Sequence, residues 1–492
     1  MPVSQHRADG LWVPGRTPYR APGADAQLGP SAITAIALVC IACGVAVVLA
    51  EWDALFVGLA VIACLGILVD FRVGVVLLII LMPLSYSELF PHQIAGVTGL
   101  NPINILLMGT LGAALLHALN DRNLSSFLPQ PLFWLYIVPF LIAGARGSRH
   151  VAEIPAFYFM TDTIHFTSST GFLRDLVVKP ILLVAFALLV ARAVAKAKNS
   201  EKFLVPIAVS VWVMSLMVIV YFVLSGSRLS DIASSSARRF LSPLGMHAND
   251  FSRMYVTAYA LLLFTWAETR NHLAKLVLLA SMGMALLAGV LTFSRGGFAG
   301  FVLVMALFLA SRRRIGSMIV CLALLATAAL FIPDAVYDRA SSGFGLGANA
   351  ISAGRIDAIW IPLIPDVLKS PIFGSGLSSM LWSDAVRTGR SILAVHPHNA
   401  YLQTILDMGL VGMVLTGLYL GHLWLRFRRL ANDSRLTASE RGFFGGAAAG
   451  LVAFLVMSVS DGSLTPKPEQ VYVWLAVGMM YGHCLRLKPG GQ

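Results

Sequence analysis

The sequence predicts an all-α polytopic membrane protein with about 12–14 transmembrane helices. The first observation is composition: 57% of the residues are hydrophobic and only 12% are charged, about half the charged share of an ordinary soluble domain. The second is a mean hydropathy of +0.78. The third is a recurrence of apolar runs of about 17–22 residues, the length needed to cross a bilayer. Together these observations exclude a soluble globular class.

The chain opens with a polar segment and then becomes a series of apolar runs. Residues 1–30 are rich in Pro and Gly, so we expect a disordered cytoplasmic tail without a removable signal peptide. The run near 73–90 contains Pro83 and several polar residues, so we expect a broken helix there. The predicted spans are 32–50, 54–70, 73–90, 102–119, 131–145, 175–195, 203–224, 250–267, 273–292, 297–311, 315–332, 401–425, 442–460 and 469–485.

These runs divide the chain into four parts. The tail at 1–30 precedes a transmembrane bundle at 31–332, a large loop follows at 333–400, and the C-terminal transmembrane helices occupy 401–485. The loop contains several prolines, a Gly-rich run and the helix-like piece GRIDAIWIPLIPDVL. A long loop with its own amphipathic helices is typical of a cap over an active site.

Basic clusters predict the orientation of the spans, because short loops rich in Lys and Arg stay in the cytoplasm. With fourteen spans, three such clusters and both termini fall on one side, which we assign to the cytoplasm, and the 333–400 loop faces outward. The clusters are Lys196/Lys198/Lys202, Arg312/Arg313/Arg314, and Arg426/Arg428/Arg429 with Arg435 and Arg441.

The stretch HPHNAYLQTILDMGLVG (396–412) places a polar cluster at the mouth of an apolar helix. Histidine is the side chain best suited to accept a proton near neutral pH, so His396 and His398 are candidate bases. A solvated polar cap is the more common role of such a histidine. Asn399 could orient the base or bind a sugar hydroxyl, and Gly409 and Gly412 would let a neighbouring helix pack closely.

A candidate anion site lies in LTFSRGGFAG, where one predicted helix ends outside and the next begins. Arg295 supplies a charge, Gly296 and Gly297 leave backbone N–H groups open, and the helix N-terminus adds its positive dipole end. The alternative is an arginine that snorkels to the interface after a tight turn. Every other outward arginine is more simply explained as neutralised by outward acids: Arg146, Arg149, Arg174, Arg228, Arg238, Arg239, Arg253, Arg339, Arg355, Arg387 and Arg390.

Acidic residues near the histidines are further candidates. Asp407 lies inside a predicted span about two and a half helical turns beyond His398, so we expect it to face away and pair within the bundle. Asp461 and Glu469 lie on the last outward turn and could contact the site.

No metal, cofactor or nucleic acid is expected. Histidines two residues apart do not share a helical face, and no third ligand is specified for His396 and His398. No nucleotide-binding glycine loop precedes a helix in a cytoplasmic segment, and the cysteines form no metal-ligand pattern. The net charge of +12 is spread over both membrane faces, which favours membrane lipid and a diphosphate as partners over nucleic acid.

Four sequence elements resemble the bacterial O-antigen ligase and O-antigen (exopolysaccharide) polymerase family of membrane glycosyltransferases. The His398-Asn399 pair followed by Gly409 and Gly412 is the first. The others are the Ser-Arg turn at 294–297, the large-loop pattern GRIDAIW followed by SPIFGSGL (354–360 and 370–377), and GMHANDFSR (245–253), which carries Gly245 and Asn249 but Ala248 where the family usually has Pro. The resemblance covers about 240–425. The first half of the chain matches only as a stack of membrane helices.

The resemblance implies an inverting transfer on the periplasmic side of the bacterial inner membrane. The donor would be an undecaprenyl-diphosphate-linked oligosaccharide, and the acceptor a sugar hydroxyl. Arg295 and Arg355 are suited to hold the diphosphate, and the motif match gives the role of general base to His398. Substrate-orienting roles are expected for Asn399, Tyr401, His396 and Asn249, although His396 could also be the base.

Three functions are compatible with these features. The first is polymerisation of O-antigen or exopolysaccharide repeat units, and the second is ligation of the glycan to lipid A core. The third, from another class, is a lipid or solute transporter. A transporter would place charges at the midplane of discontinuous helices, often in two repeated halves, whereas here no internal repeat is found and the polar residues gather in outward loops.

Overall fold

The computed structural model describes residues 58–91, 93–94, 97–99, 101–120, 128–159, 162–226, 236–312, 341, 343 and 345–487. The chain separates into two units, Met1–Gly58 and Leu59–Gln492. The predicted tail at 1–30 and the predicted spans at 32–50 and 315–332 lie outside the described residues, so the count of fourteen spans stays a prediction.

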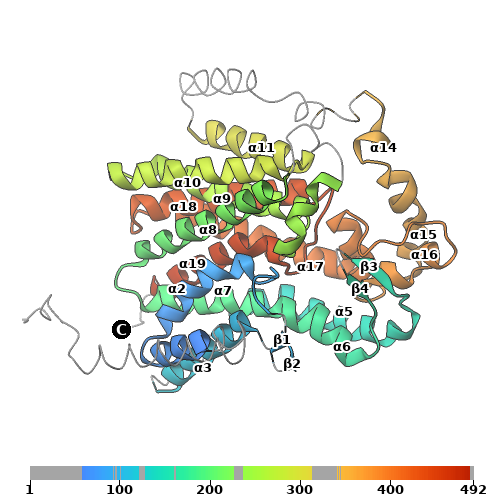
Figure 1. Cartoon of the computed structure of the whole chain (residues 1–492), viewed down its shortest axis with the longest axis horizontal. Helices are drawn as coiled ribbons and strands as arrows, with labels where there is room; N and C mark the ends of the chain where they lie inside the picture. Colours follow the sequence, from blue (N-terminus) through green and yellow to red (C-terminus); the bar gives the residue numbers. More distant parts are fainter. Residues whose placement is uncertain are drawn as a thin grey trace, which may run out of the picture. The chain divides into compact units, whose positions relative to one another are not determined.

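The described part of the second unit is almost entirely helical (Figure 1), which confirms the predicted all-α membrane class. The strands are two short antiparallel hairpins, β1 (Gln93–Ile94) with β2 (Val97–Thr98) and β3 (Phe157–Phe159) with β4 (Asp162–Ile164). The longer helices are α2 (Phe71–Leu81), α3 (Pro102–Asn120), α5 (Val138–Gly147), α7 (Lys179–Lys196), α8 (Leu204–Leu224), α9 (Ala248–Glu268), α10 (His272–Leu291), α11 (Arg295–Arg312), α17 (Ala400–Ala431), α18 (Ala438–Met457) and α19 (Val471–Arg486).

Seven helical segments among the described residues are long and apolar enough to cross a membrane: Pro102–Leu119, Gln130–Glu153, Ser169–Lys196, Ser200–Leu224, His272–Leu291, Ala400–Ala431 and Ala438–Met457. Shorter apolar helices cover Gly58–Val69, Phe71–Leu84 and Arg295–Ser311. The chain is therefore a multi-pass membrane protein. The break expected within 73–90 is present, because α2 ends at Leu81 and a 3-10 turn that contains Pro83 follows.

Two tightly packed helix pairs hold the connection between α18 and α19. Gly442 and Gly446 of α18 lie against the α9 backbone, where an added Cβ would come 2.5 Å from the Phe264 carbonyl oxygen and 2.4 Å from that of Ala260. Gly478 of α19 approaches α7 in the same way, with the Ala187 carbonyl oxygen at 2.5 Å from an added Cβ. Small residues permit this close approach, and the segment 458–470 is thereby fixed at one end of the bundle.

The helix α17 is broken at Gly409, whose φ of +66° lies in the left-handed region. The loop before it replaces the missing helical hydrogen bonds. The amide of Leu410 donates to the Pro371 carbonyl at 2.8 Å, and the amide of Gly376 donates to the Asp407 carbonyl at 2.9 Å. We expected a neighbouring helix to pack against Gly409, and this is wrong. A loop fills this space and forms the backbone hydrogen bonds that the break in the helix leaves open.

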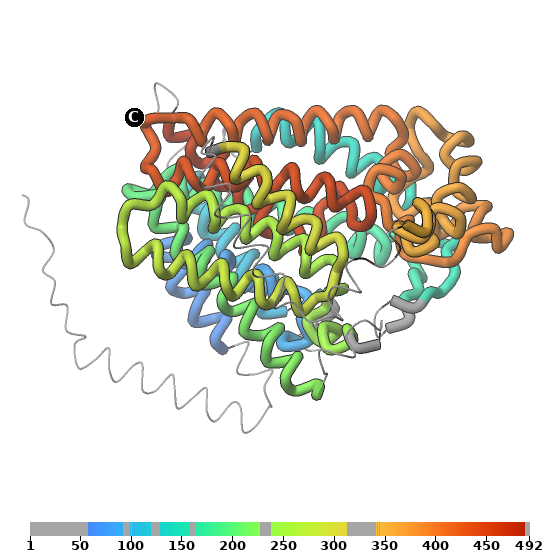
Figure 2. Tube along the Cα trace, turned by 90° about the horizontal axis from the view of Figure 1, so that it is seen from above, coloured from blue at the N-terminus to red at the C-terminus, as the bar shows by residue number. Residues whose placement is uncertain are grey.

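Short helices between 345 and 399 form a cap at one end of α17, to the right in Figure 2. They are α14 (Ala348–Ile351), the π-helical turn η7 (Ile356–Trp360), α15 (Ile361–Lys369), the 3-10 turn η8 (Ser379–Trp382) and α16 (Asp384–Arg387). Their own small core contains Ile359, Leu363, Met380, Ala385 and Leu406. The Trp360 indole donates to the Pro397 carbonyl at 2.8 Å, which ties the cap to the histidine stretch.

Candidate functional site

The histidine stretch lies where the cap joins α17. Asn399 caps this helix, because its side-chain oxygen accepts hydrogen bonds from the amides of Tyr401 and Leu402 at 3.0 Å each. His398, just before it, has a φ of +52°, a conformation that costs a non-glycine residue of the order of 1–3 kcal/mol. Its backbone N–H donates to Nδ1 of His396 at 3.2 Å. The strained turn therefore positions one histidine against the other.

Asp461, from the connection between α18 and α19, completes a dyad with His398. Their Nδ1 and Oδ1 atoms lie 3.0 Å apart although the residues are 63 positions apart in sequence. The carboxylate also accepts from the Gly462 amide at 2.9 Å and from the Asn249 side chain at 2.5 Å. Because a carboxylate accepts at Nδ1, that nitrogen carries a proton, so in the neutral imidazole of His398 the free proton acceptor is Nε2.

The charge states at the dyad follow from burial and from neighbouring groups. Burial opposes ionisation of Asp461, but the hydrogen bond from His398 and the positive charge of Arg253 hold the pKa of this carboxyl well below its usual range. Burial lowers the pKa of His396 well below its usual range, and the Lys467 ammonium acts in the same direction. His396 is therefore neutral near pH 7, with its Nδ1 3.9 Å from Asp461 Oδ1.

Arg253 of α9 approaches Oδ2 of Asp461, whereas both histidines approach Oδ1. Its side chain is 2% exposed and lies close to three carboxylates: it pairs with Asp250, and its guanidinium nitrogens are 3.4 Å from Glu469 and 3.9 Å from Asp461. Gly462, with a φ of +92°, lies on the guanidinium, where an added Cβ would be 2.9 Å from Cζ. Burial and the charge of Asp250 raise the pKa of Glu469 to about 6.

The structure brings both arginines expected to hold a diphosphate to the residue next to Asp461. The guanidinium of Arg355 donates to the Ser460 carbonyl. Arg295 begins α11, and an added Cβ on Gly296 beside it would lie 3.7 Å from Ser460 Oγ. Burial lowers the pKa of Arg355, Asp461 opposes this effect, and the positive charge of Arg295 reinforces it. The Arg355 guanidinium and the start of α11, which carries Arg295, thus both lie near Ser460.

The remaining predicted residues have partners within the protein. Tyr401 donates its hydroxyl to the Leu455 carbonyl at 2.8 Å, which links α17 to α18. Asp407 does not pair within the bundle as expected, because its carboxylate accepts from the amide and the hydroxyl of Ser379 in the cap at 3.0 and 2.9 Å. Asn249 bonds Asp461 and so reaches the site indirectly.

The donor atoms of His396, His398 and Asp461 lie within 4.8 Å of one another. The third potential ligand that the sequence does not specify is therefore Asp461, which lies far from the histidines in sequence. Against a bound cation stand the guanidinium of Arg253 at 3.9 Å from the same carboxylate and the nearby charges of Lys467 and Arg355. The expected absence of a metal stays a prediction.

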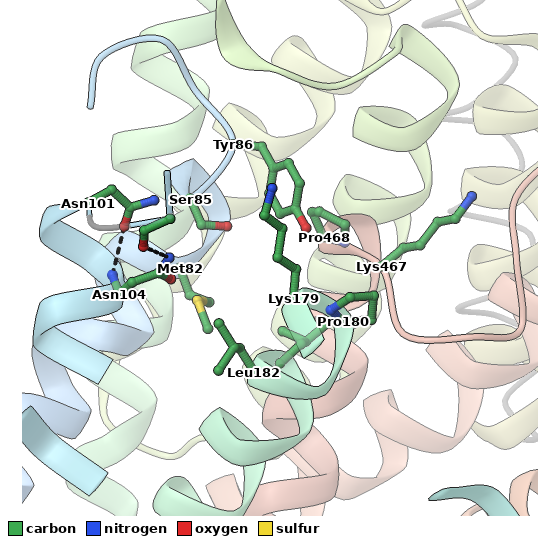
Figure 3. A pocket seen from close by; sticks show the side chains of 12 residues that line it. Met82, Ser85, Tyr86, Asn101, Asn104, Lys179, Pro180, Leu182, Lys467 and Pro468 are labelled. Carbon is green, nitrogen blue, oxygen red and sulfur yellow. Dashed lines mark hydrogen bonds between the residues drawn. The ribbon is translucent and has the colours of Figure 1, made fainter. Parts of the chain in front are cut away.

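A separate cavity of about 150 Å³ reaches the same connection through Lys467 and Pro468 (Figure 3). Ser85, Asn101 and Asn104 give it a polar side, and the Lys467 side chain extends away from the other labelled residues. Lys179, also at its wall, is paired with Asp175 at 2.7 Å. None of the residues predicted for the site lines this cavity, so the dyad and the arginines form a distinct place on the molecule.

Sequence reasoning gave too little weight to two residues. Arg253 was counted among arginines with ordinary neutralising partners, and Asp461 was noted without a motif. The available signal for Arg253 was its position within a predicted membrane helix, where a charge is costly and usually functional. Nothing local in the sequence indicates that Asp461 pairs with His398.

Comparison with known families agrees with the resemblance found in the sequence. Residues 279–417 match the model of a family described as O-antigen ligase. The matched region contains Arg295, Arg355 and His398, while Arg253 and Asp461 lie outside it. No curated protein matches the chain. Residues 279–417 of this multi-pass membrane protein are therefore similar to the O-antigen ligase family.

Proposed function

We propose that the protein is an inverting glycosyltransferase that polymerises O-antigen or exopolysaccharide repeat units carried on undecaprenyl diphosphate. The observation that carries the proposal is the His398–Asp461 pair, 3.0 Å apart, with Arg355 bound to the adjacent Ser460 and the charge of Arg295 acting on Arg355. A base held by a carboxylate next to two cationic side chains is the arrangement that transfer of a sugar from a diphosphate needs.

The reaction would proceed in one displacement. The acceptor sugar hydroxyl gives its proton to Nε2 of His398 while its oxygen forms a bond to the anomeric carbon of the donor. The bond from that carbon to the diphosphate oxygen breaks on the opposite face, and undecaprenyl diphosphate leaves with the electron pair. Arg295 and Arg355 stabilise the charge on the leaving group, and Asp461 stabilises the imidazolium that forms.

Arg253 acts as a positioning residue in this scheme. It is buried in α9, where Nη1 of its guanidinium lies 3.9 Å from Asp461 and Nη2 contacts Asp250 and Glu469. Leaving it unpaired would place an uncompensated charge in the bundle, which is costly. Arg253 thus keeps the Asp461 carboxylate in position to accept from His398.

We further propose that the site is periplasmic and that both termini are cytoplasmic, in the bacterial inner membrane. Support comes from α17, which carries Arg426, Arg428 and Arg429 at the end opposite His398. Short basic segments stay on the cytoplasmic side. The site then faces the compartment in which a lipid-linked glycan would meet its acceptor.

A second candidate is ligation of the glycan to lipid A core, which the description of the matched family favours. The same dyad and arginines would serve it, since only the acceptor differs. A transporter is less well supported, because the charged cluster lies at one end of the bundle beside the cap.

Reconstitution tests these alternatives. Purified protein in liposomes would receive a defined undecaprenyl-diphosphate repeat unit in the presence of a chelator. We expect a ladder of longer lipid-linked glycans, and none from the His398→Ala variant. Product that forms only after lipid A core is supplied would identify a ligase. Intact donor with its glycan moved across the bilayer would overturn both proposals in favour of transport, and activity restored only by a divalent metal would overturn metal independence.

A further inference from the structure

The cap presents an apolar helix face that the described residues leave uncovered. On α15, Ile361, Ile364 and Leu368 are 53, 50 and 69% exposed. Their spacing of three and four residues places them on one side of the helix. The opposite side is used by Leu363 and Val367, which pack into the core of the cap. Contiguous exposed apolar surface of this kind marks an interaction site.

Exposed apolar residues also follow in the loop after α15 and on the membrane-spanning helix to which this loop is bound. Ile372 and Phe373, in the loop after α15, are 56 and 64% exposed. The loop is bound to α17 by the backbone bonds from Leu410 and Val411 to the Pro371 and Ile372 carbonyls, at 2.8 and 3.0 Å. Further along α17, the exposed side chains are again apolar: Leu410, Val411, Val414 and Leu418.

The length of α17 places this loop at the edge of the hydrocarbon layer. Gly409 and Arg428 are separated by about 28 Å along a helix with a rise of 1.5 Å per residue, close to the roughly 30 Å of a bilayer core. With Arg428 at the opposite headgroups, Gly409 and the attached loop lie at the boundary on the cap side. The part of α17 before Gly409 then belongs to the cap.

Polar groups border the apolar face as they do in helices that lie on a membrane. Lys369, at the end of α15, pairs with Asp366 and Asp384, and Arg146 donates to the Ser370 hydroxyl at 3.3 Å. Basic side chains next to an apolar face are suited to the headgroup region while the apolar face enters the acyl chains.

We propose that α15 together with Ile372 and Phe373 is an interfacial anchor that inserts into the lipid leaflet on the cap side of the membrane. The occupant of the face is the bilayer itself. The exposed apolar side chains of α15 and its loop adjoin those of the membrane-spanning α17, so a soluble partner bound there would have to share the surface with the acyl chains. The anchor fixes the cap at the depth of the headgroups and does not depend on the proposed reaction.

Photocrosslinking in liposomes tests the anchor in the whole protein. A benzophenone-bearing phenylalanine analogue would replace Phe373, and in a matched control it would replace Thr388, which is exposed on the polar side of the same cap. The liposomes contain a phospholipid with a fluorescent label. After irradiation we expect a labelled lipid adduct at 373 at several times the level at 388.

A second position keeps the test decisive if the 373 variant does not fold. Leu368, exposed on the same face, should give the same lipid adduct. Equal labelling at 368, 373 and 388 would overturn the anchor. A chain-to-chain adduct at 368 or 373 in place of the lipid adduct would assign the face to a second copy and would also overturn it.

Discussion

His398 is held by contacts from two distant parts of the chain. The connection after α18 supplies Asp461, and Asn249 of α9 and the Gly462 amide hold this carboxylate in turn. The Asp461 carboxylate orients the imidazole and selects the tautomer that leaves Nε2 free to accept a proton.

Replacement of Asp461 by Asn should therefore lower kcat by about 10²–10⁴-fold, the range typical of lost general-base catalysis. Donor affinity should change little, since the arginines remain. Turnover and binding of the undecaprenyl-diphosphate substrate would be measured separately on reconstituted protein. Asp384→Asn, which alters an exposed carboxylate of the cap, is the control. Wild-type turnover in Asp461→Asn would remove the dyad from the mechanism.

Replacement of the arginines should instead weaken donor binding. Arg295→Ala is expected to weaken donor binding about tenfold or more, because a charge-assisted hydrogen bond to phosphate contributes about 1.5–3 kcal/mol. Arg390→Ala, an exposed arginine of the cap, should bind the donor like the wild type. The measurement is the Kd for undecaprenyl diphosphate. An unchanged Kd in Arg295→Ala would show that the diphosphate lies elsewhere.

The raised pKa of Glu469 predicts that the stability of the protein depends on pH. Its pKa of about 6 lies above the ordinary value of 4.5, so the folded protein binds this proton more tightly than the unfolded chain. The associated stability is complete below about pH 4.5 and is lost as the pH rises through 6. Glu469→Gln mimics the protonated form, so the variant should gain on the wild type between pH 5 and 7.5.

The expected gain is of the order of 1–2 kcal/mol, since one pKa unit corresponds to about 1.4 kcal/mol. Thermal unfolding of both proteins in detergent across this range gives the difference in Tm. The lowered pKa of His396 contributes stability that is lost as the pH falls, the opposite of the Glu469 effect. This contribution is common to both proteins, so it cancels when wild type and variant are compared at each pH. A constant difference in Tm would contradict the assigned pKa.

At the scale of elements, the break in α17 decides where the cap lies. Glycine is required at 409 for two reasons: the φ of +66°, and the space, because an added Cβ would lie 2.3 Å from the Ile372 carbonyl oxygen and 2.4 Å from the Gly374 nitrogen. Both facing groups belong to the backbone and cannot rotate away. The loop 370–377 and the helix are therefore matched to each other.

Gly409→Ala should detach this loop, lower Tm by several degrees and reduce turnover strongly. Gly417→Ala is the matched control, because this glycine lies in the same helix with open space around it. The control should be neutral or stabilised by up to about 1 kcal/mol, as expected when Ala replaces Gly within a helix. If both variants melted alike, the loop would not depend on the break.

Sequence reasoning reached those parts of the fold and site that local patterns encode. Apolar run lengths predicted the membrane helices, and short motifs singled out His398, Arg295 and Arg355, which the structure places around Ser460 and Asp461. The pairing of Asp461 with His398 could not be predicted, because it joins residues 63 positions apart through helix packing that no short motif describes. The partner of Gly409 was wrong for the same reason, since a glycine pattern indicates close approach without indicating to what.

At the scale of the whole molecule, two groups of arginines lie at opposite ends of α17. Arg253, Arg295 and Arg355 lie with the acids of the site, while Arg426, Arg428 and Arg429 lie at the far end of α17. Only the second group is a short basic segment of the kind that stays in the cytoplasm. In the first group, carboxylates contact Arg253 and a backbone carbonyl accepts from Arg355, so these charges do not belong to a cytoplasmic basic segment.

This separation predicts the orientation of the protein. Single cysteines placed at Thr388 in the cap and at Asn432 after α17, each in a background without the native cysteines, would be exposed to a membrane-impermeant thiol reagent in whole cells. We expect labelling at 388 and none at 432 until the inner membrane is opened. The reverse result would place His398 and Asp461 in the cytoplasm, where a periplasmic transfer is impossible. Labelling at both positions in intact cells would indicate a leaky membrane, which a soluble cytoplasmic protein detects as the control.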